Sequence, residues 1–406
     1  MQYLAEIRQA WRPLAAATLG LGTGMSIAGT ITSAIGPSLV ADAGWTKSQF
    51  AITGALGLLT AASMPFIGRL ADVWGVKLTA LIGLVAMPLA LLGYSLSGGS
   101  FAVYMAVFVA QSILGVTTTA TIYTRLVVQS VNRARGLALA IAACGPALFS
   151  AIGGPVLNEY VETHGWAAAY RALAIFVAIA GIVTFLLIPS ERSASRGAQK
   201  ARRPAREDYP EIFRSRTFWI LFGSMYLCNL PLTLYLVQLK MLVMDNGITG
   251  EGASIMFTAL AGGMLTGRFV TGLALDRLPP QIVSFVTLAL PGLGLFVLAS
   301  PYDAPGIITF SIFCLGFSAG AEGDILSFLV ARYFRTAIYS SVLGLLIAVT
   351  SIAAASGAAL LSWTLALTGT FNTFLVTTGI AVIAGSILLL LLGRTAAPIE
   401  VAQQPA

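Results

Sequence analysis

Charge is what this sequence has least of. Only 10% of its 406 residues are Asp, Glu, Lys or Arg, whereas 57% are hydrophobic. A soluble globular domain carries about 25% charged residues, so this chain has too few charges to cover a surface that faces water. The composition therefore excludes an ordinary soluble protein and indicates a protein whose surface faces lipid.

Histidine and cysteine are also scarce. The single histidine, His164, lies in a predicted loop, and Cys144, Cys228 and Cys314 lie in predicted helices. These residues cannot form a set at metal-ligand spacing, and the cysteines are better explained as small packing residues. The sequence also lacks an HExxH motif, a P-loop and any nucleophile–base pair. We therefore expect no enzyme, no cofactor and no ATP-driven pump.

Long runs without any charge fill most of the chain. A membrane-spanning helix needs about 20 apolar residues, so the longest runs must turn and cross twice. Dividing two of them at Ser97–Gly99 and Thr368–Gly369 gives about twelve helices. The predicted fold is an all-α integral membrane protein with two six-helix lobes, at residues 1–190 and 217–406, joined by a basic linker at 191–216.

The distribution of Lys and Arg predicts the orientation in the membrane. The linker 191–216 holds eight basic residues, and most other basic residues fall in loops on the same side. Basic loops stay in the cytoplasm, so we expect a cell-membrane protein with both termini cytoplasmic. No small-residue cleavage site precedes Trp11, so we expect the first helix to be retained. The net charge of +7 then reflects topology, and we expect no nucleic-acid partner.

The two halves of the chain repeat each other. The turn GRLADVWG, at Gly68–Gly75, follows the second predicted helix, and GLALDRL, at Gly272–Leu278, follows the eighth. The ends of the fourth and tenth helices also align, which places Tyr123 opposite Asp324. Such repeats are typical of secondary transporters, whose substrate site lies near the midplane between the lobes.

The first of these turns combines residues with distinct physical roles. Gly68 lets two helix ends approach closely, and Gly75 permits a tight reversal. Asp72 is placed either to cap the next segment or to pair with a nearby base. Lys77 is placed to anchor in the cytoplasmic headgroups.

Together with Leu70, these residues resemble the loop motif of the major facilitator superfamily between its second and third helices. Val73 and Val76 replace the basic residues that are usual in that motif. The resemblance extends to the whole chain, since about twelve helices and a basic central loop are the superfamily's pattern. It implies a transporter that works by alternating access.

A narrower resemblance lies at NRARGLALAIAACG, Asn132–Gly145, which is similar to the signature that opens the fifth helix of monocarboxylate transporters and oxalate/formate antiporters. Ala140 and Cys144 replace the common Gly and Ala. Arg268 matches the membrane arginine that binds the substrate carboxylate in those families, but Met264 stands where an acid is frequent. The acidic motif of their first helix and a membrane lysine in helix one or eleven are also missing. The resemblance implies a carrier of small organic anions, monocarboxylate-like, with or without a coupled proton.

Four charged residues lie within predicted helices: Arg125 on the fourth, Arg268 on the eighth, and Glu322 and Asp324 on the tenth. A charge inside the bilayer is tolerated where it faces a cavity or a partner, and two acids can balance two arginines. Arg268 either grips a substrate carboxylate with its fork of donors or forms an ion pair with Glu322 or Asp324. Arg125 either reaches the headgroups or bridges Asp324 as a gate on the cytoplasmic side.

The two acids are two residues apart, so on a helix their side chains point about 200° from each other. We expect one to meet the cavity and carry a coupled proton, and the other to pair with an arginine. Polar residues on other helices, each either a substrate contact or a helix–helix contact, are Tyr123, Tyr226 and Asn229. Pro231 is expected to break the seventh helix.

The expected partners are a small carboxylate substrate, protons and the lipid bilayer, and we expect a monomer. The alternative is an exporter of drugs or metabolites of the same superfamily, which needs an apolar cavity and a single acid. The paired arginines argue against it. A channel has no special signature to test in this sequence.

Overall fold

The computed structural model describes residues 2–45, 57–189, 205–237, 239, 242, 251–301 and 304–393. Most of the predicted basic linker lies outside this part of the chain. Within the described residues, the first half contains these α-helices: α1 (Gln2–Gln9), α2 (Trp11–Gly22), α3 (Ala28–Ala43), α5 (Gly57–Trp74), α6 (Val76–Leu96), α7 (Phe101–Leu114), α8 (Ala120–Ser130), α9 (Arg135–Leu148), α10 (Gly154–His164) and α11 (Trp166–Leu187).

The second half follows the same pattern within the described residues. Its helices are α12 (Ala205–Arg214), α13 (Arg216–Asn229), α14 (Leu232–Val237), α16 (Glu251–Leu275), α17 (Pro280–Leu298), α18 (Pro305–Tyr333), α19 (Tyr339–Thr368) and α20 (Asn372–Leu388). The predicted divisions at Ser97–Gly99 and Thr368–Gly369 fall in the turns before α7 and α20. The predicted break at Pro231 is also confirmed, since it lies between α13 and α14.

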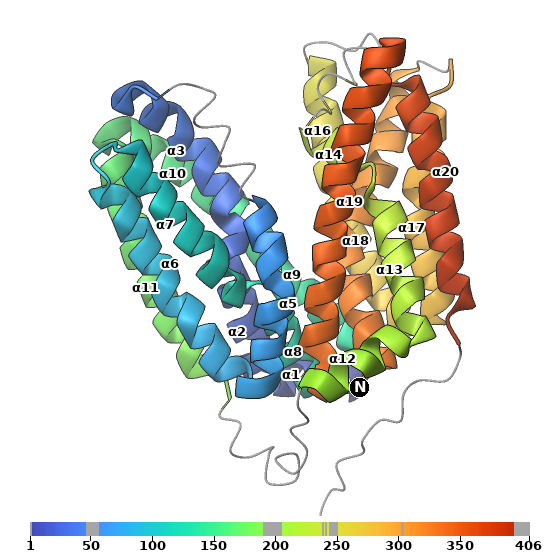
Figure 1. Cartoon of the computed structure of the whole chain (residues 1–406), viewed down its shortest axis with the longest axis horizontal. Helices are drawn as coiled ribbons and strands as arrows, with labels where there is room; N and C mark the ends of the chain where they lie inside the picture. The colour runs from blue at the N-terminus through green and yellow to red at the C-terminus, as the bar shows by residue number, and fades with distance from the viewer. Residues whose placement is uncertain are drawn as a thin grey trace, which may run out of the picture.

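Apolar length accounts for the membrane-spanning part of the described chain. Nine segments are long and apolar enough to cross a bilayer, and the bent pair formed by α2 and the start of α3 makes a tenth. In Figure 1, α5 and α16 run alongside these segments. The predicted all-α membrane fold is confirmed.

Several spans are made of two helical pieces. A 3₁₀ segment, Gly115–Thr118, joins α7 to α8. A π-helical segment, Phe149–Gly153, joins α9 to α10. Local π geometry widens a helix by one residue and is frequent at functional sites.

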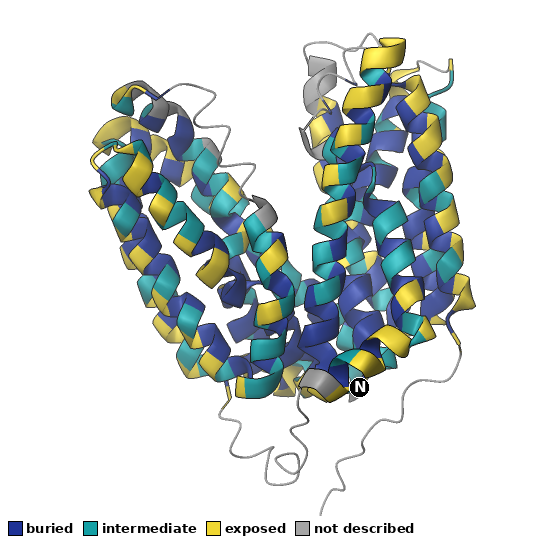
Figure 2. Ribbon diagram, viewed as in Figure 1, coloured by how far each residue is buried: buried dark blue, intermediate teal, exposed yellow. Residues whose placement is uncertain are grey.

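The two lobes meet at one end of the bundle, which we call the closed end and define by the positions of α1 and α12. Figure 1 shows the ribbons of the lobes side by side at this end and diverging away from it. Figure 2 shows buried residues concentrated where they meet. The lobes are joined there by contacts of α5 with α19 and of α9 with α16.

Glycine makes these cross-lobe contacts possible. A Cβ atom at Gly68 of α5 would overlap the carbonyl oxygen of Ser340, and one at Gly136 of α9 would overlap that of Gly272. The absence of a side chain therefore lets the backbones of the two lobes touch. This bears out the expectation that Gly68 permits close approach, although its neighbour is a helix of the other lobe.

Candidate functional site

Asp72, at the last turn of α5, caps a helix in the opposite lobe. Its carboxylate accepts hydrogen bonds from the backbone N–H groups of Ser340, at 3.1 Å, and Ser341, at 2.7 Å, and from the Ser341 hydroxyl, at 2.6 Å. These two residues lie in the first turn of α19, whose N–H groups have no partner within the helix. Gly75 begins α6 with a φ of 83°, so the tight reversal is as predicted. Of the two roles predicted for Asp72, capping the next segment is wrong, because the capped helix is α19 and not α6, whereas pairing with a nearby base is confirmed by its ion pair with Arg125.

Arg125 forms an ion pair with Asp72 inside the N-terminal lobe, through its Nη1 atom. Both residues are buried, and the Asp72 side chain is only 1% exposed. The predicted bridge from Arg125 to Asp324 is therefore absent from this conformation, and so is an extension to the headgroups. The reason is that α8 packs against α5, which brings Arg125 to the level of Asp72.

Arg268 is the arginine that contacts Asp324. Its Nε atom lies 3.7 Å from Oδ2 of Asp324 on α18, within the same lobe. Its Nη1 atom donates a hydrogen bond to the carbonyl oxygen of Ala143, on α9 of the other lobe. The Arg268 side chain is 23% exposed, so it is more accessible than the Arg125–Asp72 pair. Arg268 thus links the two lobes deeper in the bundle than the turns do.

Glu322 points to a different helix. Its Oε1 atom accepts a 2.6 Å hydrogen bond from the amide of Asn229 on α13, and that amide also donates to the carbonyl of Met225 at 2.8 Å. The two acids of α18 therefore face opposite neighbours, as their spacing predicts. Asp324 is 4% exposed, whereas Glu322 is partly exposed.

The predicted balance of two acids against two arginines is incomplete. Asp72 is a third buried acid, and it takes Arg125. Asp324 forms an ion pair with Arg268, so the partner of Glu322 is the neutral amide of Asn229. Among the described residues, Glu322 is the acid of this group that has no arginine partner.

The remaining candidates are two tyrosines. Tyr123 is fully buried and packs on Gly20 of α2, where a Cβ atom would overlap its ring. Its hydroxyl has no hydrogen-bond partner within the described chain. Tyr226, on α13, is partly buried. A substrate contact for either tyrosine stays a prediction.

Lys77 does not behave as an exposed anchor. Its Nζ atom donates to the carbonyl oxygen of Ile188 at 3.2 Å and lies 4.7 Å from the centre of the Phe185 ring. It therefore closes the last turn of α11, where carbonyl groups have no partner within the helix. The expectation that Lys77 reaches the headgroups does not account for these contacts.

The second copy of the turn was identified from the sequence, but its role as a second cap was not. Asp276, after α16, accepts hydrogen bonds from the backbone N–H groups of Gly136, at 2.6 Å, and Leu137, at 3.0 Å, in the first turn of α9. The repeat of Gly68 and Asp72 in Gly272 and Asp276 was the available signal. Each lobe thus caps one helix of the other.

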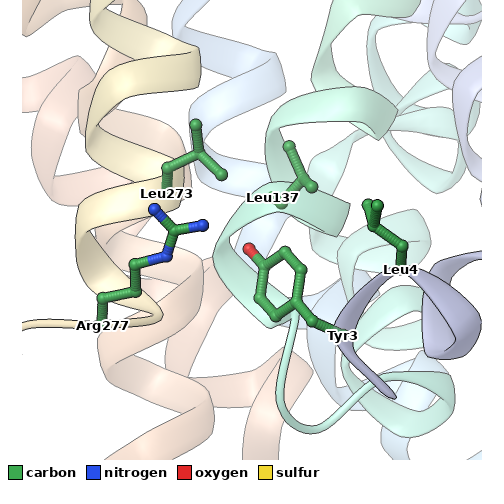
Figure 3. A pocket seen from close by; sticks show the side chains of 5 residues that line it. All are labelled: Tyr3, Leu4, Leu137, Leu273 and Arg277. Carbon is green, nitrogen blue, oxygen red and sulfur yellow. The ribbon is translucent and has the colours of Figure 1, made fainter. Parts of the chain in front are cut away.

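A cavity of about 420 Å³ lies next to the second cap. It is lined by residues of α1, α9 and the α16 end, shown in Figure 3, which are Tyr3, Leu4, Leu137, Leu273 and Arg277. The Arg277 guanidinium lies 5.8 Å from the centre of the Tyr3 ring. Both lobes therefore contribute walls to this cavity.

The described residues contain no cluster of three or more His, Cys, Asp and Glu side chains that could hold a metal ion. The site contains the Arg268 guanidinium between the two lobes, the Asp324 carboxylate beside it, and the Glu322 carboxylate, which is hydrogen-bonded to the Asn229 amide. These groups can bind an anion and hold a proton.

Comparison with known proteins agrees with this arrangement. The sequence profile of the Major Facilitator Superfamily matches residues 14–345. The chain is 26% identical to the 3-(3-hydroxy-phenyl)propionate transporter of Escherichia coli (strain K12) over 390 residues, covering 92% of this chain and 91% of that protein.

Solved structures show the same fold. The transporter FucP, in its outward conformation, superimposes with a TM-score of 0.78 at 13% identity, covering 96% of this chain and all of FucP. The human organic anion transporter MFSD10 (TETRAN) gives a TM-score of 0.67 at 16% identity, covering 95% of this chain and 99% of that one. The profile spans most of the chain, and the structural relatives are transporters rather than enzymes. This chain therefore belongs to the Major Facilitator Superfamily and is a membrane transporter.

Proposed function

We propose that this transporter carries small organic anions, in particular monocarboxylates with an apolar or aromatic body, by alternating access. The observation that carries the proposal is the position of Arg268. It is partly exposed, it lies between the lobes, and among the described residues it contacts one carboxylate, at 3.7 Å, and one carbonyl oxygen. A substrate carboxylate can take the place of the carbonyl and accept two parallel hydrogen bonds from the same guanidinium.

The relative named as a 3-(3-hydroxy-phenyl)propionate transporter supports a carboxylate attached to an aromatic ring. The resemblance of Asn132–Gly145 to the monocarboxylate and oxalate/formate branch also supports a carboxylate substrate, but one with a smaller apolar part. Both point to one carboxylate as the recognised group.

Replacing Arg268 tests this assignment. Arg268→Lys keeps the charge but loses the fork, so the substrate should bind about 10- to 100-fold more weakly, since a hydrogen bond to a charged group contributes about 1.5–3 kcal/mol. The measurement is uptake of labelled phenylpropionate and shorter acids into proteoliposomes. Arg171→Lys, at an exposed position of α11, is the matched control. Normal affinity in a well-folded Arg268→Ala protein would refute the assignment.

We further propose that Glu322 carries a coupled proton and that Asp324 holds Arg268. Protonation of Asp324 would break an ion pair, whereas protonation of Glu322 breaks none. The amide of Asn229 can donate to a charged carboxylate through its NH₂ group, and after rotation it can accept from a protonated one through its oxygen. Asn229 therefore suits both states of Glu322.

Two mutants separate these roles. Glu322→Gln fixes the side chain in its neutral form, so it should still exchange substrate but lose accumulation driven by a pH gradient. Asp324→Asn should retain a response to the gradient and change substrate affinity instead. If both mutants accumulate substrate normally, neither acid carries a coupled proton, and the protein is an exchanger or a uniporter.

The orientation is also a proposal, in which the closed end faces the cytoplasm. It is supported by basic residues at the turns of this end, including Arg69, Arg133 and Arg335. A cysteine at Ser195, which lies in the basic linker outside the described residues, should resist an impermeant maleimide added to intact cells. Efficient labelling would reverse the orientation.

A further inference from the structure

Two short helices lie across the closed end, one before each lobe. Figure 1 shows α1 and α12 at this end, where the ribbons of the lobes meet. α1 precedes α2 and α12 precedes α13, the first spanning helix of each lobe. Both contain the dipeptide Glu-Ile, at Glu6–Ile7 and at Glu211–Ile212. The internal repeat of the chain therefore includes these helices.

α1 is bonded to both lobes. The Glu6 carboxylate accepts hydrogen bonds from three successive backbone N–H groups of its own lobe, at distances of 2.8, 2.9 and 3.0 Å, namely those of Asn132, Arg133 and Ala134. The Tyr3 hydroxyl donates a 2.7 Å hydrogen bond to Asp276 of the other lobe. Burial and the bond to Asp276 raise the pKa of the Tyr3 phenol, so it stays protonated and keeps its role as donor.

α12 is bonded to both lobes in the same way. The Glu211 carboxylate receives two hydrogen bonds from Arg335 of its own lobe, at 3.1 Å from Nε and 2.7 Å from Nη2. Asp208 forms a 2.6 Å ion pair with Arg69 of the other lobe. A weaker contact of 3.6 Å joins Asp208 to Arg335.

The two helices use matching positions. In each, a glutamate bonds to the turn that precedes a helix of its own lobe, α9 for Glu6 and α19 for Glu211. In each, the residue three positions earlier, Tyr3 or Asp208, bonds to the opposite lobe. Residues three apart lie on the same face of a helix, so one face of each helix contacts both lobes.

We propose that α1 and α12 form a pair of clasps that hold the closed end shut, each through a bond that crosses the lobes. Opening of this end must separate Gly68 from Ser340 and Gly136 from Gly272, and therefore must also break the Tyr3–Asp276 and Asp208–Arg69 bonds. The bonds of Glu6 and Glu211 lie within one lobe and keep each helix docked while the end is open.

The two clasps differ in strength. The Asp208–Arg69 bond joins two charged groups, whereas the Tyr3–Asp276 bond joins a neutral donor to a charged acceptor. The cavity beside Tyr3 also leaves the α1 clasp less tightly packed, since Leu137 and Leu273 from opposite lobes face the same empty volume (Figure 3). The α12 clasp is therefore the stronger one.

Labelling of a buried cysteine tests the proposal without knowledge of the substrate. Ser340 is 0% exposed and lies where α5 meets α19, so Ser340→Cys, in a full-length chain with the three native cysteines replaced by alanine, reports opening of the closed end. Tyr3→Phe should increase its rate of reaction with a maleimide about threefold to tenfold. Asp208→Asn should increase it about tenfold or more, and the double variant by about the product of the two factors.

Two controls separate release of the clasps from unfolding. Ser224→Cys, equally buried but inside the C-terminal lobe between α13 and α20, should keep its slow rate, because opening leaves that lobe intact. Glu162→Gln removes an acid that bonds to Asn158 on α10, away from both clasps, and should leave the Ser340→Cys rate unchanged. A double variant that labels Ser340→Cys at the parent rate would overturn the proposal. So would equal acceleration at both reporter positions, which would mean that the variants unfold.

Discussion

Each lobe buries one pair of an arginine and an aspartate, and the two pairs lie at different depths. In the N-terminal lobe, Asp72 pairs with Arg125 at the closed end. In the C-terminal lobe, Asp324 pairs with Arg268. Aligning Gly272 with Gly68 places Arg268 opposite residue 64, eight residues before Asp72, which is about 12 Å along a helix at 1.5 Å per residue.

The two pairs also differ in their hydrogen bonds and in their exposure. Asp72 receives three further hydrogen bonds from Ser340 and Ser341, and its side chain is 1% exposed. Asp324 has one ion pair at a longer distance, and its partner Arg268 is 23% exposed. The first pair lies within one lobe and is fixed there, whereas on the proposed function the second pair holds a guanidinium that can change partners. On the proposed function, the same two residue types stabilise the fold in one lobe and bind substrate in the other.

The largest expected effect comes from breaking the fixed pair. Asp72→Asn leaves Arg125 buried without a counter-charge, which typically costs about 3–5 kcal/mol. Thermal unfolding in detergent should show a marked loss of stability. The variant Asp72→Asn/Arg125→Leu removes both charges and should regain much of it. Equal losses in the single and double variants would mean that the ion pair is not what stabilises this turn.

The exchangeable pair should tolerate the same change better. Asp324→Asn removes the charged partner that lies 3.7 Å from Arg268, and leaving a polar group without its partner costs about 1–3 kcal/mol. The loss is smaller because Arg268 keeps the Ala143 carbonyl and has access to solvent. Thermal unfolding in detergent, measured as for Asp72→Asn, shows whether Asp324→Asn loses less stability. A loss as large as that of Asp72→Asn would abolish the distinction between the pairs.

The helices and the motif turn could be predicted from the sequence, but most of the contacts could not. Uncharged runs, glycine pairs and Pro231 mark where helices begin, end and break, because those are local properties of the chain. The partner of Arg125 depends on which helices are neighbours in space, and neither hydropathy nor spacing contains that information. The sequence offered four membrane charges to pair, and Asp72 was left out because its motif places it in a turn.

The glycine contacts should give effects of intermediate size and test whether the two turns are equivalent. Gly68→Ala and Gly136→Ala each place a methyl group against a carbonyl of the other lobe, and overpacking costs about 1–3 kcal/mol. Both should increase maleimide labelling of Ser340→Cys to a similar degree. Gly262→Ala, where a Cβ atom has no neighbour within 4 Å, is the matched control. A large effect at only one turn would show that the closed end opens unevenly.

The smallest expected effect concerns a cross-lobe bond close to the fixed pair. The Tyr339 hydroxyl donates a buried 3.0 Å hydrogen bond to Thr124, one residue before Arg125. The repeat equivalent of Thr124 is Ile325, so the other lobe lacks this bond. Thr124→Val should cost about 0.5–1.5 kcal/mol and speed Ser340→Cys labelling modestly. Labelling as fast as in Gly68→Ala would place more of the closing energy in this single bond than its type supplies.

The π-helical segment Phe149–Gly153 has a mechanical consequence for the span that carries Ala143. A π turn holds one residue more than an α turn, so a return to α geometry would rotate everything beyond it by about 100°, since an α-helix turns once in 3.6 residues. Ser150, inside this segment, bonds to Thr30 of α3 at 2.7 Å and would shift as the segment rewinds, while α9 would stay packed on α2 through Gly145. In this span, α10 can therefore rotate about its axis, while α9, which contacts Arg268, stays in place.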